Sequence, residues 1–226
     1  MDIDAVEVKK ICGFIPKNID IYINAFVHKS LGKGINSYER LEFIGDSVVG
    51  LIVADILYEM FPNESEGFLT RVRTKIVSSK GLSMLSKELK LHNFIKMNEK
   101  AVMNKWNENP RILEDVFESF MGALYLDRGI LTCKKFMKKL INKYIDMNEI
   151  VKDTNYKDIL MKYLQCNKKP QAMYKISNES GPDHAKIFTI QLEIDGKKIA
   201  EGYDSIKKIA EQKAALRALT ILEVVY

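Results

Sequence analysis

Two stretches of the chain carry acidic side chains at helical spacing inside otherwise apolar runs. The residues are Glu39, Glu42 and Asp46 in the first stretch and Asp115 and Glu118 in the second. On a helix that advances about 100° per residue, the first three lie within a stripe roughly 60° wide, and the last two form an i, i+3 pair. Ionised carboxylates among apolar neighbours need a compensating positive charge. The pattern therefore predicts two helices whose acidic faces share a hard divalent cation, for which oxygen ligands are suited.

The residues around these acids favour a cation over an internal salt bridge. No Lys or Arg lies at matching helical spacing except Arg40 and Arg111, which point to other faces. Gly45 precedes Asp46, and its missing side chain permits a close approach of the second helix. We expect that approach to bring the two groups of carboxylates together.

Length and composition describe an ordinary globular protein with one or two domains. The 226 residues include 46% hydrophobic and 29% charged residues, and the net charge of +5 permits a polyanionic partner without requiring one. The three cysteines have no paired or metal-like spacing, which is typical of reduced thiols in an intracellular protein. A secretory signal and a membrane-spanning run are absent from the pattern, so we expect a cytoplasmic protein with no membrane partner.

The hydrophobic periodicity of the first 148 residues is helical almost throughout. A long helix is expected to open with Asn36 as an N-cap paired to Glu39 and to stop at Phe61-Pro62. Further helices are predicted over 67–78, 79–89, 111–126 and 132–147, the last with a solvated lysine-rich face. Residues 1–148 are therefore predicted to form an all-α domain.

The periodicity changes near residue 150, and residues 154–226 read as a second, α+β domain. A helix over 156–165 is followed by strands over 172–177, 188–194 and 197–202, the second with strict period-two alternation. Asp195-Gly196 predicts a hairpin turn between the last two strands. A final helix from about residue 205 carries alanines at i, i+4 spacing, which allow it to lie close against a sheet. The predicted order is α-β-β-β-α.

Several motifs in this chain resemble the bacterial-type ribonuclease III family over nearly its whole length. The motifs are ERLEFIGDS (39–47), DVFES (115–119), AFVHKS (25–30) and EGFLTRVR (66–73), followed by GPDHAKIF (181–188) and KKIAEQKAA (207–215). The last two resemble a double-stranded-RNA-binding domain. The chain departs from the family at Tyr38, where Asn or a similar polar residue is usual. It departs again at Ile206, where Ser is usual, which puts one capping or phosphate contact in doubt.

The resemblance implies an all-α endonuclease domain that hydrolyses double-stranded RNA and leaves 5′-phosphate and 3′-hydroxyl ends. By this resemblance the metal ligands are Glu42, Asp46, Asp115 and Glu118, and the catalytic residues are Asp46, Glu118, Glu39 and Glu66. The expected cofactor is Mg²⁺, with Mn²⁺ able to replace it. Two of these acids have simpler alternatives, because Glu39 could serve only as a helix cap and Glu66 only as an acid favoured at a helix start.

The resemblance also assigns RNA contacts. The residues are Gln165, His184, Lys207, Lys208 and His28. Lys207 and Lys208 open a helix, where backbone N–H groups also favour phosphate. Recognition should follow the shape of the A-form duplex and weaken with salt. The alternative for His28 is a hydrogen-bonded structural histidine, and for the lysine pair a solvated helix start.

One catalytic domain cuts one strand, so the family's homodimer through the catalytic domain is expected here, with Phe43, Ile44 and neighbours near Met121 as candidate interface residues. Two alternatives to the enzyme remain at this point. A non-catalytic binder could sequester duplex RNA, for example as a silencing suppressor, although such a protein would be expected to lose its carboxylates. A helical scaffold for protein contacts would leave the acids unexplained.

Overall fold

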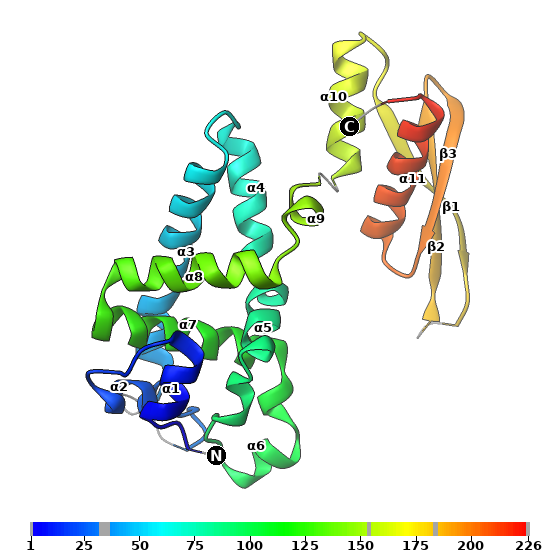
Figure 1. The fold of residues 1–226 in the computed structure, drawn as a ribbon. Helices are drawn as coiled ribbons and strands as arrows, with labels where there is room; N and C mark the ends of the chain where they lie inside the picture. The colour runs from blue at the N-terminus through cyan, green and yellow to red at the C-terminus, as the bar shows by residue number, and fades with distance from the viewer. Residues whose placement is uncertain (1, 32–36, 153–154, 183–184, 225–226) are drawn as a thin grey trace. The chain divides into compact units, whose positions relative to one another are not determined.

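The computed structural model describes residues 2–31, 37–152, 155–182 and 185–224. It divides into two compact units, Met1–Val151 and Lys152–Tyr226, each with its own hydrophobic core. The first unit is helical (Figure 1), and its helices are α1 (Ala5–Cys12), α2 (Ile19–Asn24), α3 (Glu39–Met60), α4 (Glu66–Ile76), α5 (Ser79–Glu88), α6 (Glu99–Met103), α7 (Pro110–Arg128), α8 (Ile130–Tyr144) and α9 (Met147–Val151). Among the described residues, no helix is both long enough and apolar enough to cross a membrane.

The crossing of α3 and α7 forms the centre of the helical unit. A β-carbon added to Gly45 would lie 1.8 Å from the backbone oxygen of Glu118, and one added to Gly122 would lie 2.2 Å from the backbone oxygen of Leu41. Each helix thus supplies a glycine at the point where it meets the backbone of the other. The close approach predicted from Gly45 is confirmed, and Gly122 is its counterpart on α7.

The ends of the helices follow from local capping. Side chains of Ser65 and Ser78 accept backbone N–H groups at the starts of α4 and α5, while Asn109 caps α7 and Pro110 occupies its first position. Helix α3 begins with Tyr38 at the cap position and no side-chain cap. Asn36, which was expected to cap it, lies outside the described residues.

One predicted helix is divided in the structure. The sequence predicted a continuous helix over 132–147, but α8 ends at Tyr144 and Ile145 is extended. Asp146 then starts α9, because its carboxylate accepts the backbone N–H of Asn148 at 2.9 Å and its carbonyl accepts that of Ile150 at 3.0 Å. The prediction of one helix was wrong because the apolar periodicity continues across this local break.

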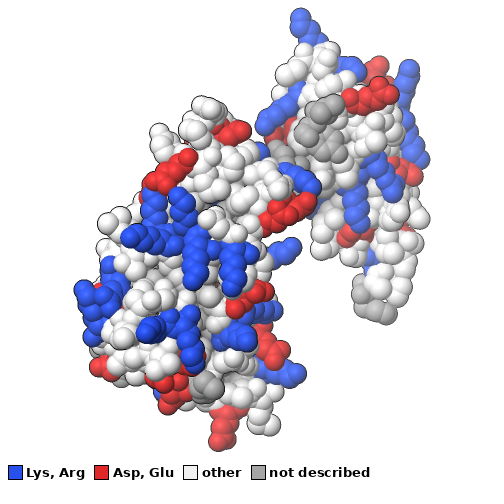
Figure 2. All heavy atoms as spheres, in the orientation of Figure 1, with Lys and Arg blue, Asp and Glu red and all other residues white. Residues whose placement is uncertain are grey.

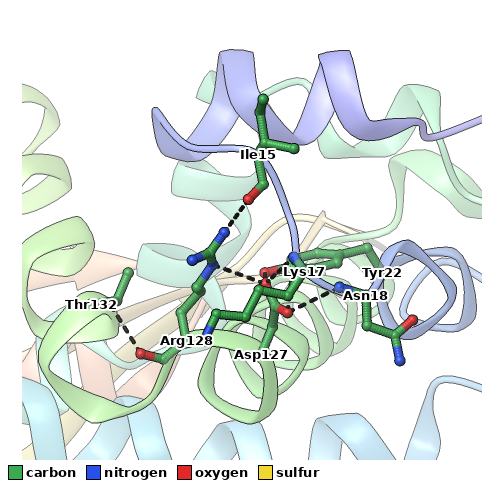
Figure 3. A network of polar contacts seen from close by, with 7 residues as sticks. All are labelled: Ile15, Lys17, Asn18, Tyr22, Asp127, Arg128 and Thr132. Carbon is green, nitrogen blue, oxygen red and sulfur yellow. Dashed lines mark hydrogen bonds and ion pairs between the residues drawn. The ribbon is translucent and has the colours of Figure 1, made fainter.

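A buried carboxylate ties the segment before α2 to the end of α7 (Figure 3). The side chain of Asp127 is 1% exposed. It accepts the backbone N–H groups of Lys17 and Asn18 and the hydroxyl of Tyr22, all at 3.1 Å, and pairs with Arg128 at 3.3 Å. With these partners the carboxylate of Asp127 is fully hydrogen-bonded and stabilises the fold.

The second unit has the predicted α-β-β-β-α order. Its elements are α10 (Tyr156–Cys166), β1 (Ala172–Ser180), β2 (Ile187–Ile194), β3 (Lys197–Asp204) and α11 (Lys207–Ile221). The strands form an antiparallel sheet in the order β1-β2-β3, and the two helices share one core with β2 and β3 (Figure 1). Asp195 and Gly196 have positive φ values of 53° and 70°, which confirms the predicted two-residue turn.

Helix α11 lies close to the sheet through small residues. Ala210, Ala214 and Ala218 are fully buried, and a β-carbon on Gly202 of β3 would lie 2.1 Å from the backbone oxygen of Ala210. The expectation from the alanine spacing is confirmed.

Substitution of Gly45 by Ala should strongly destabilise the helical unit. The added methyl group would overlap the α7 backbone, which cannot move like a flexible side chain, so we expect a loss of about 3 kcal/mol or more in the free energy of unfolding. Urea-induced unfolding followed by circular dichroism measures it. Gly67→Ala on α4 is the matched control, because its added β-carbon meets no atom within 4 Å, and it should be neutral or gain up to about 1 kcal/mol. Equal behaviour of the two variants would contradict the backbone contact.

Candidate active site

The close crossing of α3 and α7 brings the predicted acidic residues to one place. Glu42 and Asp46 come from α3, and Asp115 and Glu118 come from α7. They are near enough to influence one another, since Asp46 raises the pKa of Glu118 and Asp115 raises the pKa of Glu42. Glu114, which the sequence had not singled out, adds to the same field.

The cluster lies at the solvent edge of the crossing and not within the core. Glu118 is 9% exposed and Glu42 and Asp115 are partly buried, but Asp46 is exposed and Phe43 is 78% exposed. The expectation that all these acids sit among buried apolar side chains was therefore wrong. Helix α3 packs against α7, α4 and α8 and leaves its remaining side exposed, so its acidic stripe spans the boundary between core and solvent. A site in this position is open to a large substrate.

Burial and mutual repulsion raise the pKa values of three of these carboxyl groups. Burial is the main cause that raises the pKa of Glu118 to about 8, followed by the charge of Asp46. Burial, and then the charge of Asp115, raise the pKa of Glu42 to about 7. The pKa of Asp115 is raised mainly by burial, and a hydrogen bond from Tyr38 opposes that effect. At Glu42 and Asp115, burial and repulsion outweigh the opposing positive charge of Lys29.

The donor set fits a hard divalent cation. The side-chain carboxylates of Glu42, Asp46 and Glu118 form no hydrogen bond or ion pair with another residue in the described part of the chain. Carboxylate oxygens are the ligands that such cations prefer. Within the described ranges, no three acidic, His or Cys side chains already surround a common point as metal ligands. The structure thus shows the donors gathered on two helices without showing a formed coordination sphere.

Glu39 occupies the rim of the cluster and already has partners. Its carboxylate pairs with Lys29 at 3.3 Å and accepts a hydrogen bond from the hydroxyl of Ser37 at 3.2 Å. Lys29 also lowers the pKa values of Glu42 and Asp115. Helical spacing could not identify this lysine as a partner of the acidic residues, because it comes from the segment before α3.

Glu66 is not brought into the cluster of its own chain. It is the first residue of α4, where Thr70 donates a hydrogen bond to its carboxylate at 2.7 Å. From Asp46 to the end of α3 at Met60 the helix rises about 21 Å, and α4 begins beyond that end (Figure 1). Within one chain, Glu66 therefore corresponds to the simpler alternative of an acid at a helix start.

His28 is buried beside the cluster and offers almost no surface to RNA. It is 3% exposed, and its Nδ1 accepts the backbone N–H of Ser30 at 3.0 Å. Its ring packs edge-on against Tyr38 and Trp106, and burial lowers its pKa. This environment corresponds to the structural alternative, and the expectation of direct RNA contact is not supported.

The second unit presents the other predicted RNA-contact residues on its surface. Gln165, Lys207 and Lys208 are exposed and line one hollow of about 700 Å³. Ile206 occupies the cap position of α11 without a side-chain cap, so the capping contact that Ser would provide is missing. His184 lies outside the described residues.

Basic side chains also cover the face of the helical unit along α8 (Figure 2). Lys134 pairs with Asp55 and Glu59 at 2.6 Å each, and Lys135 and Lys139 are exposed. The solvated lysine face predicted from the sequence is confirmed, and acidic residues of α3 neutralise part of its charge.

Without metal, the stability of the protein should fall as the pH rises. The pKa values of Glu42 and Glu118 lie above the ordinary value of 4.5, so the folded state binds more protons than the unfolded chain between about pH 4.5 and 8. Glu118→Gln removes one such group. It should stabilise the metal-free protein at pH 8 by roughly 2 kcal/mol and change little at pH 4.5.

Thermal unfolding in a chelating buffer across this pH range measures the effect of Glu118→Gln. Glu59→Gln in the same unit is the control, because Glu59 is half-exposed and paired with lysines. A stability curve that keeps its slope in the Glu118 variant would contradict the assigned charge repulsion.

Comparisons with known proteins agree with this architecture. Residues 18–145 match a family model described as ribonuclease-III-like, and residues 156–222 match the double-stranded RNA binding motif. The chain is 39% identical to ribonuclease 3 of Zunongwangia profunda over 95% of its own length and 89% of that protein. It is 35% identical to ribonuclease 3 of Streptococcus gordonii over 91% of each chain.

A solved structure shows the same relationship for the helical unit. The nuclease domain of ribonuclease III from Campylobacter jejuni superposes with a TM-score of 0.60 and 32% identity, covering 63% of this chain and 99% of that one. The matched share corresponds to the helical unit that carries the carboxylates. With both domains matched and the relatives aligned over most of their length, the chain belongs to the ribonuclease III family, the endoribonucleases of double-stranded RNA.

Proposed function

We propose that this endoribonuclease hydrolyses duplex RNA with Mg²⁺ held by Glu42, Asp46, Asp115 and Glu118. The observation that carries the proposal is the meeting of these four carboxylates at the α3–α7 crossing, where three of them have no other partner in the described part of the chain. The raised pKa values of Glu42 and Glu118 support it, because burial and neighbouring carboxylates disfavour their charged forms and a cation would offset both effects. Mn²⁺ is expected to replace Mg²⁺, since both accept oxygen ligands.

The residues of the site have different expected roles, according to their positions. Bound divalent ions would supply an activated water and shield the scissile phosphate and the leaving 3′-oxygen. Asp46 is exposed and accessible to RNA, while Glu118 is buried on α7. Glu39 is held by Lys29 at the rim, where it can position RNA or hydration water. The expected products carry 5′-phosphate and 3′-hydroxyl ends.

The second unit would bind the duplex by its shape. Lys207 and Lys208 stand in the first turn of α11, where the helix dipole and free N–H groups also favour phosphate. Gln165 lines the same hollow from α10 and can reach the minor groove. Part of the charge of Lys207 is shared with Glu179, 3.7 Å away, so its phosphate contact is expected to compete with that pair.

An apolar stripe on α3 supports a homodimer through the catalytic domain. Phe43, Leu51 and Tyr58 are 78%, 62% and 72% exposed, and their spacing places them within about 80° of one another on the helix. Exposed apolar side chains aligned along one helix face are typical of an interface. Beside Phe43 is a hollow of about 1010 Å³ that is also lined by Leu126 of α7. It could receive an apolar side chain from a second copy in an isologous contact.

Two further observations refine this dimer. Met121, a candidate interface residue from the sequence, is fully buried and belongs to the core. In the Campylobacter jejuni structure, structural flexibility is found in a region involved in dimer formation of that nuclease domain. If two α3 helices pair antiparallel, Glu66 of one chain would approach the carboxylates of the other, which would give Glu66 the place in the cleft that it lacks within one chain.

Replacement of Glu118 by Ala should abolish cleavage and preserve RNA binding. The change removes a ligand from α7 and leaves the second unit untouched, so we expect the cleavage rate of a long RNA duplex with Mg²⁺ to fall by a factor of about 100 or more. A gel-shift assay without metal should show unchanged duplex binding. Glu114→Ala, on the same helix, is the control and should stay within about tenfold of the original rate. If the unaltered protein binds the duplex and leaves it uncut, the chain is a non-catalytic binder and the proposal fails.

Replacement of Phe43 by Asp should separate the dimer. A charge on the exposed stripe would have to be desolvated in the interface, so sedimentation velocity should show a monomer with an unchanged helical spectrum. Met103→Asp is the matched control, because Met103 is 84% exposed on α6 and should leave the dimer intact. Dimers of the Phe43 variant at the same concentration would show that the contact lies elsewhere.

A further inference from the structure

Tyr38 connects the start of α3 with the proposed metal ligands on α7. Its ring is fully buried, and its hydroxyl donates a hydrogen bond to Oδ2 of Asp115 at 3.1 Å. Among the four proposed ligands, Asp115 has a side-chain partner in the described part of the chain, whereas Glu42, Asp46 and Glu118 have none. Because one oxygen of Asp115 is occupied by this donor, the orientation of the carboxylate is fixed and the other oxygen is left for a cation.

The tyrosine is itself held in place by the segment before α3. Its backbone N–H donates to the carbonyl of Val27 at 2.9 Å, and its ring packs edge-on against His28 with the centroids 5.7 Å apart. The backbone N–H of His28 in turn donates to the carbonyl of Lys96 at 2.9 Å. The His28 ring also contacts the ring of Trp106, with the centroids 6.1 Å apart.

The AFVHKS motif therefore packs against Tyr38 and restrains its ring. Ser30 holds His28 in place, because its N–H donates to Nδ1 of His28 and its hydroxyl oxygen accepts the N–H of Asn98 at 3.1 Å. The motif contributes buried contacts at this point, and these contacts explain why a histidine in the motif can matter without touching RNA.

We propose that Tyr38 is a positioning residue, which orients the Asp115 carboxylate for a divalent cation and is held for this task by His28 and its neighbours. The inference rests on the proposed function, since it assumes that Asp115 is a metal ligand. A hydrogen-bond donor behind a ligand fixes the ligand's rotamer, and loss of such a donor typically lowers metal affinity about 10- to 100-fold.

The same unit contains a matched tyrosine–carboxylate pair that lies in a different environment. Tyr22 is also fully buried, and its hydroxyl donates to Oδ2 of Asp127 at 3.1 Å, again on α7. Asp127 is committed to backbone N–H groups and to Arg128 and serves the fold (Figure 3). Tyr22→Phe therefore removes an equivalent hydroxyl without touching a proposed ligand.

The test compares Tyr38→Phe with Tyr22→Phe in the full chain, with Mn²⁺ as the probe and no RNA present. Calorimetric titration should show Mn²⁺ binding to the Tyr38 variant about tenfold or more weaker than to the unaltered protein, and unchanged binding to the Tyr22 variant. Both variants should show a similar decrease in melting temperature when metal is absent. In cleavage assays, the Tyr38 variant should need more metal for half-maximal rate, while duplex binding without metal stays the same.

Several outcomes would overturn the proposal. Unchanged Mn²⁺ affinity of the Tyr38 variant would do so, as would an equal loss of affinity in the Tyr22 variant, because general loosening of the unit would then be the cause. Combination with Asp115→Asn gives a second measurement, in which Tyr38→Phe should cause no further loss of affinity. Equal losses in both backgrounds would show that the hydroxyl acts elsewhere.

A separate result identifies failure of the proposed function itself. If Glu118→Ala binds Mn²⁺ as tightly as the unaltered protein, the cluster is not the metal site, and the inference falls together with the function. If Glu118→Ala loses Mn²⁺ and Tyr38→Phe does not, only the positioning role of Tyr38 is wrong.

Discussion

The contact between the backbones of α3 and α7 is the constraint on which the catalytic domain depends. Gly45 lies against the carbonyl of Glu118, and Gly122 lies against the carbonyl of Leu41. Neither helix can move away without losing this contact. This contact sets the separation of acidic groups that would otherwise repel one another. Rigid helices can hold like-charged carboxylates close together although they repel one another. Functional sites commonly contain such locally unfavourable contacts, which the rest of the fold stabilises.

The structure distinguishes carboxylates that stabilise the fold from carboxylates that form the candidate active site. The carboxylate of Asp127 is almost fully buried, and backbone N–H groups, Tyr22 and Arg128 satisfy it. Glu118 is also buried but has no such partners among the described residues. The two side chains lie on the same helix, so the difference reflects their surroundings and not their secondary structure. That contrast is the physical basis for assigning a cation to one and not to the other.

Much of this architecture could be predicted from local sequence. Helical spacing identified the acids, Gly45 indicated the close crossing, and Asp195-Gly196 with the alternation of the strand before it indicated the hairpin. The contacts made between distant segments could not be found in this way. Lys29 meets Glu39 from another segment, and Tyr38 meets Asp115 across 77 residues. The sequence named Phe43 as a candidate interface residue but could not establish its exposure, because an apolar run alone does not distinguish a core face from an interface.

The central claim is that the carboxylates of the α3–α7 crossing hold the divalent cation used for cleavage. A crystal structure of the protein soaked with Mn²⁺, with anomalous diffraction recorded near the manganese edge, tests this directly. We predict an anomalous peak in contact with Glu42, Asp46, Asp115 and Glu118, with one oxygen of Asp115 still bonded to Tyr38. Metal bound elsewhere in crystals of active protein, with the four carboxylates free of it, would contradict the claim.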